Sequence, residues 1–130
     1  MKLDADCYYA KTHDWVRVEG NEATCGISDY AQAALSDVVY VELPMVDDHL
    51  DQKESFGVVE SVKASEDVYM PLSGTIIAIN EELEDNPEWV NEDPYGKGWF
   101  IKVTPDDLGE LDNLMDGSAY EDYCATLEEE

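Results

Sequence analysis

Positive charge is what this sequence has least of. Its 130 residues include seven Lys and Arg against 32 Asp and Glu, so the formal net charge is −25. Such a surface repels nucleic acids and anionic lipids, and neither is expected as a partner. The charge fits two hypotheses that the sequence leaves open: adaptation to a high-salt cytoplasm, or docking onto basic faces of larger proteins.

Long hydrophobic runs and paired cysteines are also absent. No apolar stretch approaches the roughly 20 residues that cross a bilayer, and the first residues lack the apolar segment of a signal peptide. Cys7, Cys25 and Cys124 are widely spaced, and His13 and His49 lie far apart. Neither set has ligand spacing, so we expect no metal site and no disulfide. These absences predict a cytoplasmic protein with no membrane partner.

What the sequence does contain is a series of short β-prone segments separated by turns. Ser28 is placed to cap a short helix through residue 35, and Asn80 a second over residues 81–83. Residues 84–98, with two prolines and two glycines, are expected to form mostly loop. The segments predicted as strands are 15–18, 23–27, 38–43, 55–62, 67–70, 75–79 and 99–103.

The C-terminal part changes to helical periodicity. Thr104-Pro105-Asp106-Asp107 is typical of a helix start, and Ser118 with Glu121 forms a capping-box pattern. We expect one domain over residues 1–130, with a loose N-terminus (1–7), a β core (8–103) and C-terminal helices (104–127). The fold class predicted is mainly β, a compact sandwich or barrel with helices packed on its side.

Lys63 is the most informative residue, because a scarce cation stands between two strand-like runs at the expected tip of a hairpin. One hypothesis is an ordinary solvated turn lysine. The other is a covalent attachment point, held on a rigid apex beside Glu60, Glu66 and Asp67, which a modifying enzyme could recognise.

The residues around Lys63 resemble a known signature. Glu60-Ser61-Val62-Lys63-Ala64, then Asp67-Val68-Tyr69 and Pro71-Leu72-Ser73-Gly74, are similar to the lipoyl-attachment motif of the glycine cleavage system H protein family. The resemblance extends over residues 8–124. Further similar blocks, in family order, are His13-Asp14-Trp15-Val16, Gly26 to Gln32, Val39 to Pro44 and Asn91 to Trp99.

The resemblance implies a barrel-sandwich hybrid of the lipoyl- and biotinyl-carrier type, with short helices and a C-terminal helical segment. It implies a monomeric carrier, not an enzyme, with lipoate attached covalently to Lys63 and with Glu60, Ser61 and Ala64 as the attachment motif. The implied partners are glycine decarboxylase, a tetrahydrofolate-dependent aminomethyltransferase, dihydrolipoyl dehydrogenase, and a lipoate ligase or lipoyl/octanoyl transferase. The implied cargo is the aminomethyl group of glycine.

The resemblance also implies a cleft that shelters the loaded arm, with Thr12, Asp14 and Asp67 at the matching positions. Family members often have Ser and Glu in place of Thr12 and Asp14. Glycines common in the family are missing at Ser36, at Asp47 and around Gln52-Lys53.

Two other functions remain as alternatives. The first is a carrier of the same build that serves sulfur oxidation or passes lipoate to other enzymes. The second is an acidic interaction domain that keeps the fold without carrying lipoate.

Overall fold

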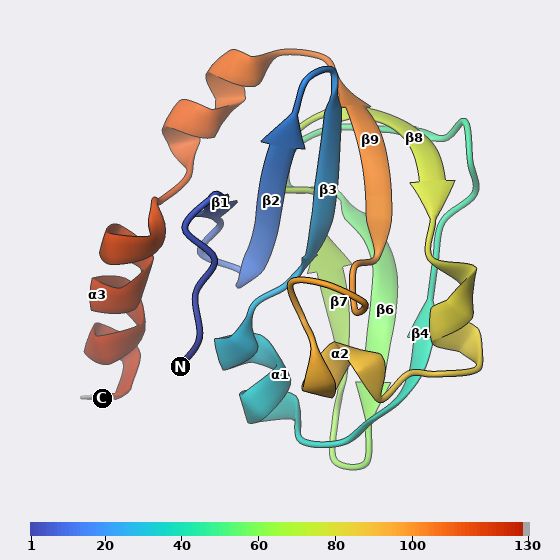
Figure 1. Cartoon of the computed structure of the whole chain (residues 1–130), viewed down its shortest axis with the longest axis vertical. Helices are drawn as coiled ribbons and strands as arrows, with labels where there is room; N and C mark the ends of the chain where they lie inside the picture. Colours follow the sequence, from blue (N-terminus) through green and yellow to red (C-terminus); the bar gives the residue numbers. More distant parts are fainter. Residues whose placement is uncertain (129–130) are drawn as a thin grey trace.

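The computed structural model describes residues 1–128, and two antiparallel β-sheets pack face to face in it (Figure 1). The larger sheet has the strand order β1-β2-β3-β9-β8-β5, and the smaller sheet has the order β4-β6-β7. The predicted mainly β sandwich with short helices is confirmed. The strands are β1 (Cys7–Tyr9), β2 (Asp14–Glu19), β3 (Glu22–Ile27), β4 (Val38–Glu42), β5 (His49–Leu50), β6 (Ser55–Ser61), β7 (Ser65–Tyr69), β8 (Gly74–Ile79) and β9 (Ile101–Pro105).

The main core lies between the two sheets and explains why these segments form strands. Alternate residues of each strand face inward, as in β9, where Ile101 and Val103 are buried on either side of a half-exposed Lys102. Val59 of β6 and Val68 of β7 supply the opposing face from the smaller sheet. Apolar alternation of this kind buries one face of each sheet and fixes its register.

Short helices close one end of the sandwich. The helix α1 (Asp29–Leu35) begins where predicted, because the Ser28 Oγ accepts a hydrogen bond from the Ala31 N–H at 3.2 Å. The 3-10 helix η1 (Glu81–Glu84) follows Asn80, whose side chain donates to the Lys97 and Trp99 carbonyls instead of capping. A single turn of helix, α2 (Trp89–Glu92), lies in the segment expected to be loop.

The C-terminal segment forms the 3-10 helix η2 (Leu108–Asn113) and the helix α3 (Gly117–Glu128). The helix start predicted at Thr104 was wrong, because Thr104 and Pro105 continue β9 and pair with β8; Asp107 caps η2 instead. The Ser118 capping box was also wrong, since Asp116 accepts the hydrogen bond from Ala119. No helix within residues 1–128 has the length and hydropathy needed to span a membrane.

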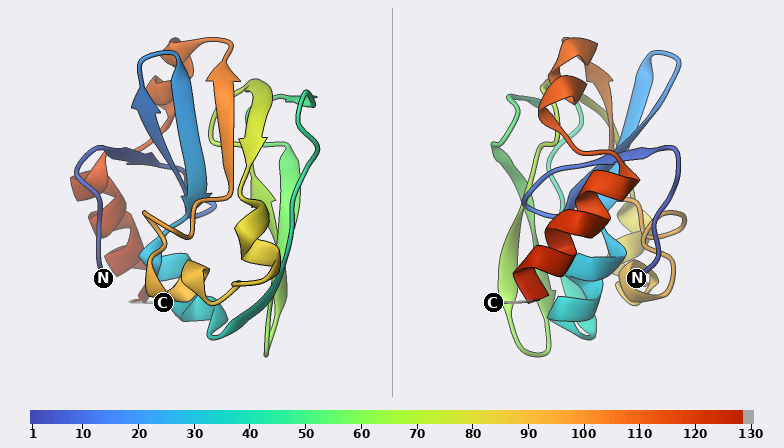
Figure 2. Two further views of the ribbon diagram at one scale, coloured as in Figure 1. Left: turned by 45° about the vertical axis from the view of Figure 1, so that its right-hand side comes forward. Right: turned by 90° about the vertical axis from the view of Figure 1, so that its left-hand side faces the viewer.

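A second, aromatic core joins α3 to the larger sheet (Figure 2). The rings of Tyr9 and Tyr120 stack with centroids 4.5 Å apart, in the same core as the buried Trp15. The N-terminus was expected to be loose over residues 1–7, but Cys7 is buried here as the first residue of β1. The backbone of Lys2 is also bound, to Asp29 and to the hydroxyl of Tyr95. Residues before β1 are therefore held by hydrogen bonds to distant residues and by the packing of Leu3 on the aromatic core, which no local pattern predicts.

Candidate functional site

Lys63 stands at the tip of the β6–β7 hairpin, which projects beyond α1 at one end of the molecule (Figure 1). Strand β6 pairs with β4 on one side and with β7 on the other. Gly57 permits a close approach to β4, because a Cβ there would lie 2.2 Å from the Glu42 carbonyl oxygen. Strand β6 is therefore paired along both of its edges, and the turn that follows it extends beyond the sheet.

The turn over residues 61–64, called here the attachment turn, is held by Ser61. The Ser61 Oγ accepts hydrogen bonds from the N–H groups of Ala64 at 3.1 Å and Lys63 at 3.3 Å. The Ser61 N–H donates to the Ala64 carbonyl, and the Val62 N–H donates to the carbonyl of Asp37. The backbone of Lys63 is thereby fixed while its side chain is exposed, which is the geometry that covalent modification requires.

The other two residues of the predicted attachment motif have separate places. Glu60 is exposed on β6, directly opposite Tyr40 of β4 and Ser65 of β7. Ala64 is half-buried and contributes to the wall of a cavity. The attachment turn therefore opens directly onto that cavity.

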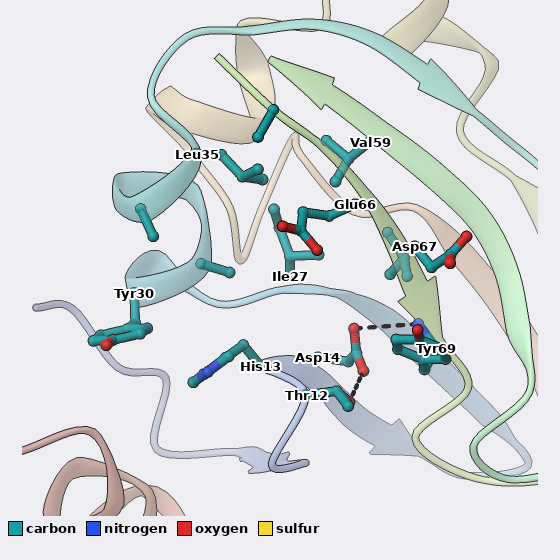
Figure 3. A pocket seen from close by; sticks show the side chains of 14 residues that line it. Thr12, His13, Asp14, Ile27, Tyr30, Leu35, Val59, Glu66, Asp67 and Tyr69 are labelled. Atoms are coloured by element: carbon teal, nitrogen blue, oxygen red, sulfur yellow. Dashed lines mark hydrogen bonds between the residues drawn. The ribbon is translucent and has the colours of Figure 1, made fainter. Parts of the chain in front are cut away.

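This cavity, the arm cleft, has a volume of about 370 Å³ and lies between α1, β7 and the turn before β2 (Figure 3). Its walls are largely apolar, and Thr12, His13 and Asp14 lie together at one end of it (Figure 3). The residues that line it are Thr12, His13, Asp14, Ile27, Tyr30, Ala31, Ala34, Leu35, Val59, Ala64, Glu66, Asp67, Val68 and Tyr69.

Thr12 and Asp14, two of the residues predicted for the cleft, meet at this end. The Thr12 hydroxyl donates to Asp14 Oδ2 at 2.5 Å, and the Tyr69 N–H reaches Asp14 Oδ1 at 3.4 Å. Asp14 is 1% exposed, and no cation pairs with it among the described residues. Burial raises the pKa of the Asp14 carboxyl to about 8, against the opposing effect of these two hydrogen bonds.

The third predicted residue, Asp67, also lines the arm cleft, but its carboxylate points away from Asp14 (Figure 3). The Ser55 hydroxyl donates to Asp67 Oδ1 at 3.3 Å on the outer side of the hairpin. Glu66 points into the cleft instead, because it shares a strand face with the buried Val68. Glu66 was expected only as one of the acids near Lys63, although the two-residue period of β7 predicts that it points into the cleft.

His13 connects the arm cleft to α3. Its Nδ1 is 2.7 Å from the Tyr120 hydroxyl, which is 2.6 Å from the Ser28 Oγ. The imidazole stacks on Tyr30 at 4.8 Å, and its backbone has a φ of 72°. Burial lowers the pKa of His13, so its neutral ring can accept a hydrogen bond from the Tyr120 hydroxyl. These contacts hold the left-handed turn that places Thr12 and Asp14 in the cleft.

Other residues singled out from the sequence lie away from this cleft. Cys7, Cys25 and Cys124 are buried thiols, and burial raises the pKa of Cys7 to about 12. His49 pairs with Asp106 on the surface. Over residues 1–128, no cluster of three His, Cys, Asp or Glu side chains could hold a metal ion.

Comparison with known proteins gives a consistent result. A family model described as Glycine cleavage H-protein matches residues 7–127. A glycine cleavage system H protein of Clostridium botulinum (strain Loch Maree) is 53% identical over 130 residues, covering 100% of this chain and 99% of the relative. One from Syntrophomonas wolfei is 52% identical over 124 residues, or 95% of each chain. The crystal structure of a Mycobacterium marinum glycine cleavage system H protein aligns with a TM-score of 0.87, at 34% identity, over 95% of this chain and 99% of that one.

Proposed function

The chain belongs to the glycine cleavage H-protein family, and from that premise we propose that it is the lipoyl carrier of a glycine cleavage system. Lipoate would be attached by an amide bond to Lys63. The observation that carries this proposal is the exposed lysine on a fixed turn whose neighbour, Ala64, already lines an apolar cleft. When attached, the lipoyl group would supply a dithiol–disulfide centre that accepts a carbon group and two electrons.

The residues of the arm cleft suit such an arm. Ile27, Leu35 and Val59 form apolar walls against which an aliphatic chain can pack, and burial there displaces water. Thr12 and Asp14 provide polar groups at the far end. An amine tethered to Lys63 would therefore reach Thr12 and Asp14 with its hydrophobic linker packed along the cleft.

Asp14 and Glu66 would bind the cationic amine of the aminomethyl cargo. Because burial raises its pKa to about 8, the Asp14 carboxyl is largely protonated in the empty cleft at neutral pH. A cation within hydrogen-bonding distance stabilises the ionised carboxylate, so loading would release a proton from Asp14. Glu66 adds a second carboxylate on the same side of β7. The cleft would thus hold the amine by charge and shield it from water.

The carrier would receive its cargo from the pyridoxal-phosphate-dependent glycine decarboxylase and deliver it to the tetrahydrofolate-dependent aminomethyltransferase. Dihydrolipoyl dehydrogenase would reoxidise it, and a lipoate ligase or lipoyl/octanoyl transferase would modify Lys63. We place this carrier in the cytoplasm as a monomer without catalytic activity of its own. The carboxylates of Glu42, Glu60 and Asp67 on the hairpin face suit basic docking surfaces on these partners.

A carrier role in sulfur oxidation or in lipoate relay is not favoured, because the relatives at about 50% identity are named glycine cleavage system H proteins.

The proposal is tested by intact mass after incubation with a lipoate ligase, lipoate and ATP, followed by bicarbonate exchange into glycine with glycine decarboxylase. Wild type should gain one lipoyl group and support exchange, Lys63→Arg should do neither, and the matched Lys53→Arg should behave as wild type. A lipoylated protein that fails to support exchange would contradict the glycine cleavage role, whereas absence of any lipoylation would contradict the carrier itself.

A further inference from the structure

A second hollow lies beside the arm cleft and shares Thr12 and Tyr69 with it. Its volume is about 480 Å³, within the range of small-molecule sites. We call it the lysine hollow. The residues that line it are Ala10, Lys11, Thr12, Gln52, Lys53, Tyr69, Met70, Pro71, Asn113 and Leu114.

The charge of this hollow is opposite to that of the protein. Asp and Glu make up 32 of the 130 residues, yet neither type lines the hollow, whereas two of the seven Lys and Arg do. Neither Lys11 nor Lys53 forms an ion pair with any described residue. Elsewhere, Arg17 pairs with Asp4, and Lys97 and Lys102 lie over tryptophan rings. The two lysines of the hollow therefore have unused charge on a surface rich in carboxylates.

Lys53 has a backbone conformation that residues other than glycine rarely adopt. Its φ is 77°, a left-handed conformation that suits glycine and costs a branched or long residue roughly 1 kcal/mol. The conformation is fixed, because the Lys53 N–H donates to the Met70 carbonyl at 2.9 Å. A glycine would fit this turn without strain, so a lysine here argues for a use of its side chain.

The floor of the hollow is rigid and partly apolar. The Gln52 side chain donates to the Pro71 carbonyl at 2.9 Å and accepts from the Asn113 amide at 3.2 Å. The Gln52 N–H donates to the Ser73 hydroxyl. Met70 and Pro71 are buried beneath it. Two lysines that line a hollow with buried apolar residues are complementary to an organic anion with a hydrophobic body.

We propose that the lysine hollow is a binding site for a small organic carboxylate, held by the ammonium groups of Lys11 and Lys53 next to the arm cleft. The site is independent of lipoate and of Lys63. Because the net charge of the protein repels anions at long range, binding is expected in the millimolar range and to be strongest where salt screens that repulsion.

The test is a titration of the unmodified, ¹⁵N-labelled full chain with glutarate at constant ionic strength, followed by amide chemical shifts. Saturating shifts are expected at the amides of residues 10–12, 52–53 and 113–114. Lys53→Gly keeps the backbone unstrained and removes the amine, and Lys11→Met removes the other; each should weaken binding roughly fivefold.

Lys2→Met is the matched control, since it removes one equally exposed charge far from the hollow and should leave the dissociation constant unchanged. The proposal is overturned if the amide shifts grow linearly with glutarate concentration without saturating, because such shifts would mean non-specific association only. It is equally overturned if Lys53→Gly and Lys11→Met both bind glutarate as tightly as wild type.

Discussion

The attachment turn and the arm cleft are neighbours that differ in how the chain builds them. The attachment turn is contiguous: Ser61 binds backbone groups within three residues of itself, and Lys63 is exposed. The arm cleft combines residues separated by more than fifty positions, such as Asp14 and Tyr69, and encloses a buried carboxyl group. A site of the first kind can be changed without affecting stability, whereas the second depends on the whole fold.

The largest expected effect is at the attachment turn. Lys63→Arg should abolish lipoylation entirely, because a guanidinium group cannot form the amide bond. Its free energy of unfolding should match that of wild type, since Lys63 forms no ion pair among the described residues. Urea unfolding and intact mass, measured on the same samples, separate the two effects. A clear loss of stability in Lys63→Arg would break the comparison.

Asp14→Asn should show the opposite behaviour, with a large effect on stability that depends on pH. Burial raises the pKa of Asp14 from 3.8 to about 8, so the folded protein keeps a proton that the unfolded chain releases. The contribution of protonated Asp14 to the free energy of unfolding is complete below the pKa of the unfolded chain, and it is lost as the pH rises towards 8. The asparagine of the variant does not titrate. Relative to the variant, the free energy of unfolding of wild type should therefore fall by roughly 2–5 kcal/mol between about pH 5 and about pH 8.

Urea unfolding of both proteins across this pH range measures that difference, and the titration of His13 cancels in it. Asp67→Asn is the matched control, because that carboxylate is exposed on the outer side of the same cleft. Parallel pH profiles for wild type and Asp14→Asn would show that Asp14 is ionised in the empty cleft.

A smaller effect is expected at the contact between α3 and the cleft. Tyr120→Phe keeps the ring stacked on Tyr9 but removes the hydroxyl that binds His13 and Ser28. The loss should cost about 1–2 kcal/mol and alter the amide shifts of residues 12–14 while leaving residues 61–64 unchanged. Tyr123→Phe, whose hydroxyl has only a 3.4 Å contact with the Lys11 carbonyl, serves as the control. Equal effects of the two variants would contradict a specific role for Tyr120.

The smallest effect concerns a turn that glycine would suit better. Ser36 ends α1 with φ 68° and ψ −154°, a region that only glycine adopts readily. Ser36→Gly should therefore stabilise the protein by about 1 kcal/mol, whereas Ser118→Gly, at an exposed position of α3, should destabilise it by roughly 0.5 kcal/mol. Thermal unfolding compares the two, and a destabilising Ser36→Gly would show that the strain is relieved elsewhere.

The features that could be predicted from the sequence follow the same division between local and long-range contacts. Strand alternation, the Ser28 cap and the residues around Lys63 are local signals, and each identified its element. Thr104 and Pro105 looked like a helix start, but pairing with β8 outweighed that local preference. The inward direction of Glu66 could have been predicted from the two-residue period of β7. The contact of Tyr120 with His13 joins residues 107 positions apart, and no local pattern could supply it.

The positions where family glycines are replaced are a further feature that the sequence alone could not explain. The family resemblance indicated that glycine is replaced at Ser36, at Asp47 and near Lys53, but the sequence could not show whether these turns had changed. Ser36, Asp47 and Lys53 all have positive φ, so the turns keep a glycine-like backbone with other side chains in place. Only the backbone angles show that the substitutions carry strain. One of the substituted residues, Lys53, lines the lysine hollow.

The most direct test of the account is a comparison of ¹⁵N amide spectra of the lipoylated protein before and after loading with the aminomethyl group. The account predicts shifts at Thr12, Asp14 and Tyr69, at the far end of the arm cleft, in addition to those near Lys63. Shifts confined to residues 61–65 would contradict it, because the loaded arm would then remain in solvent outside the cleft.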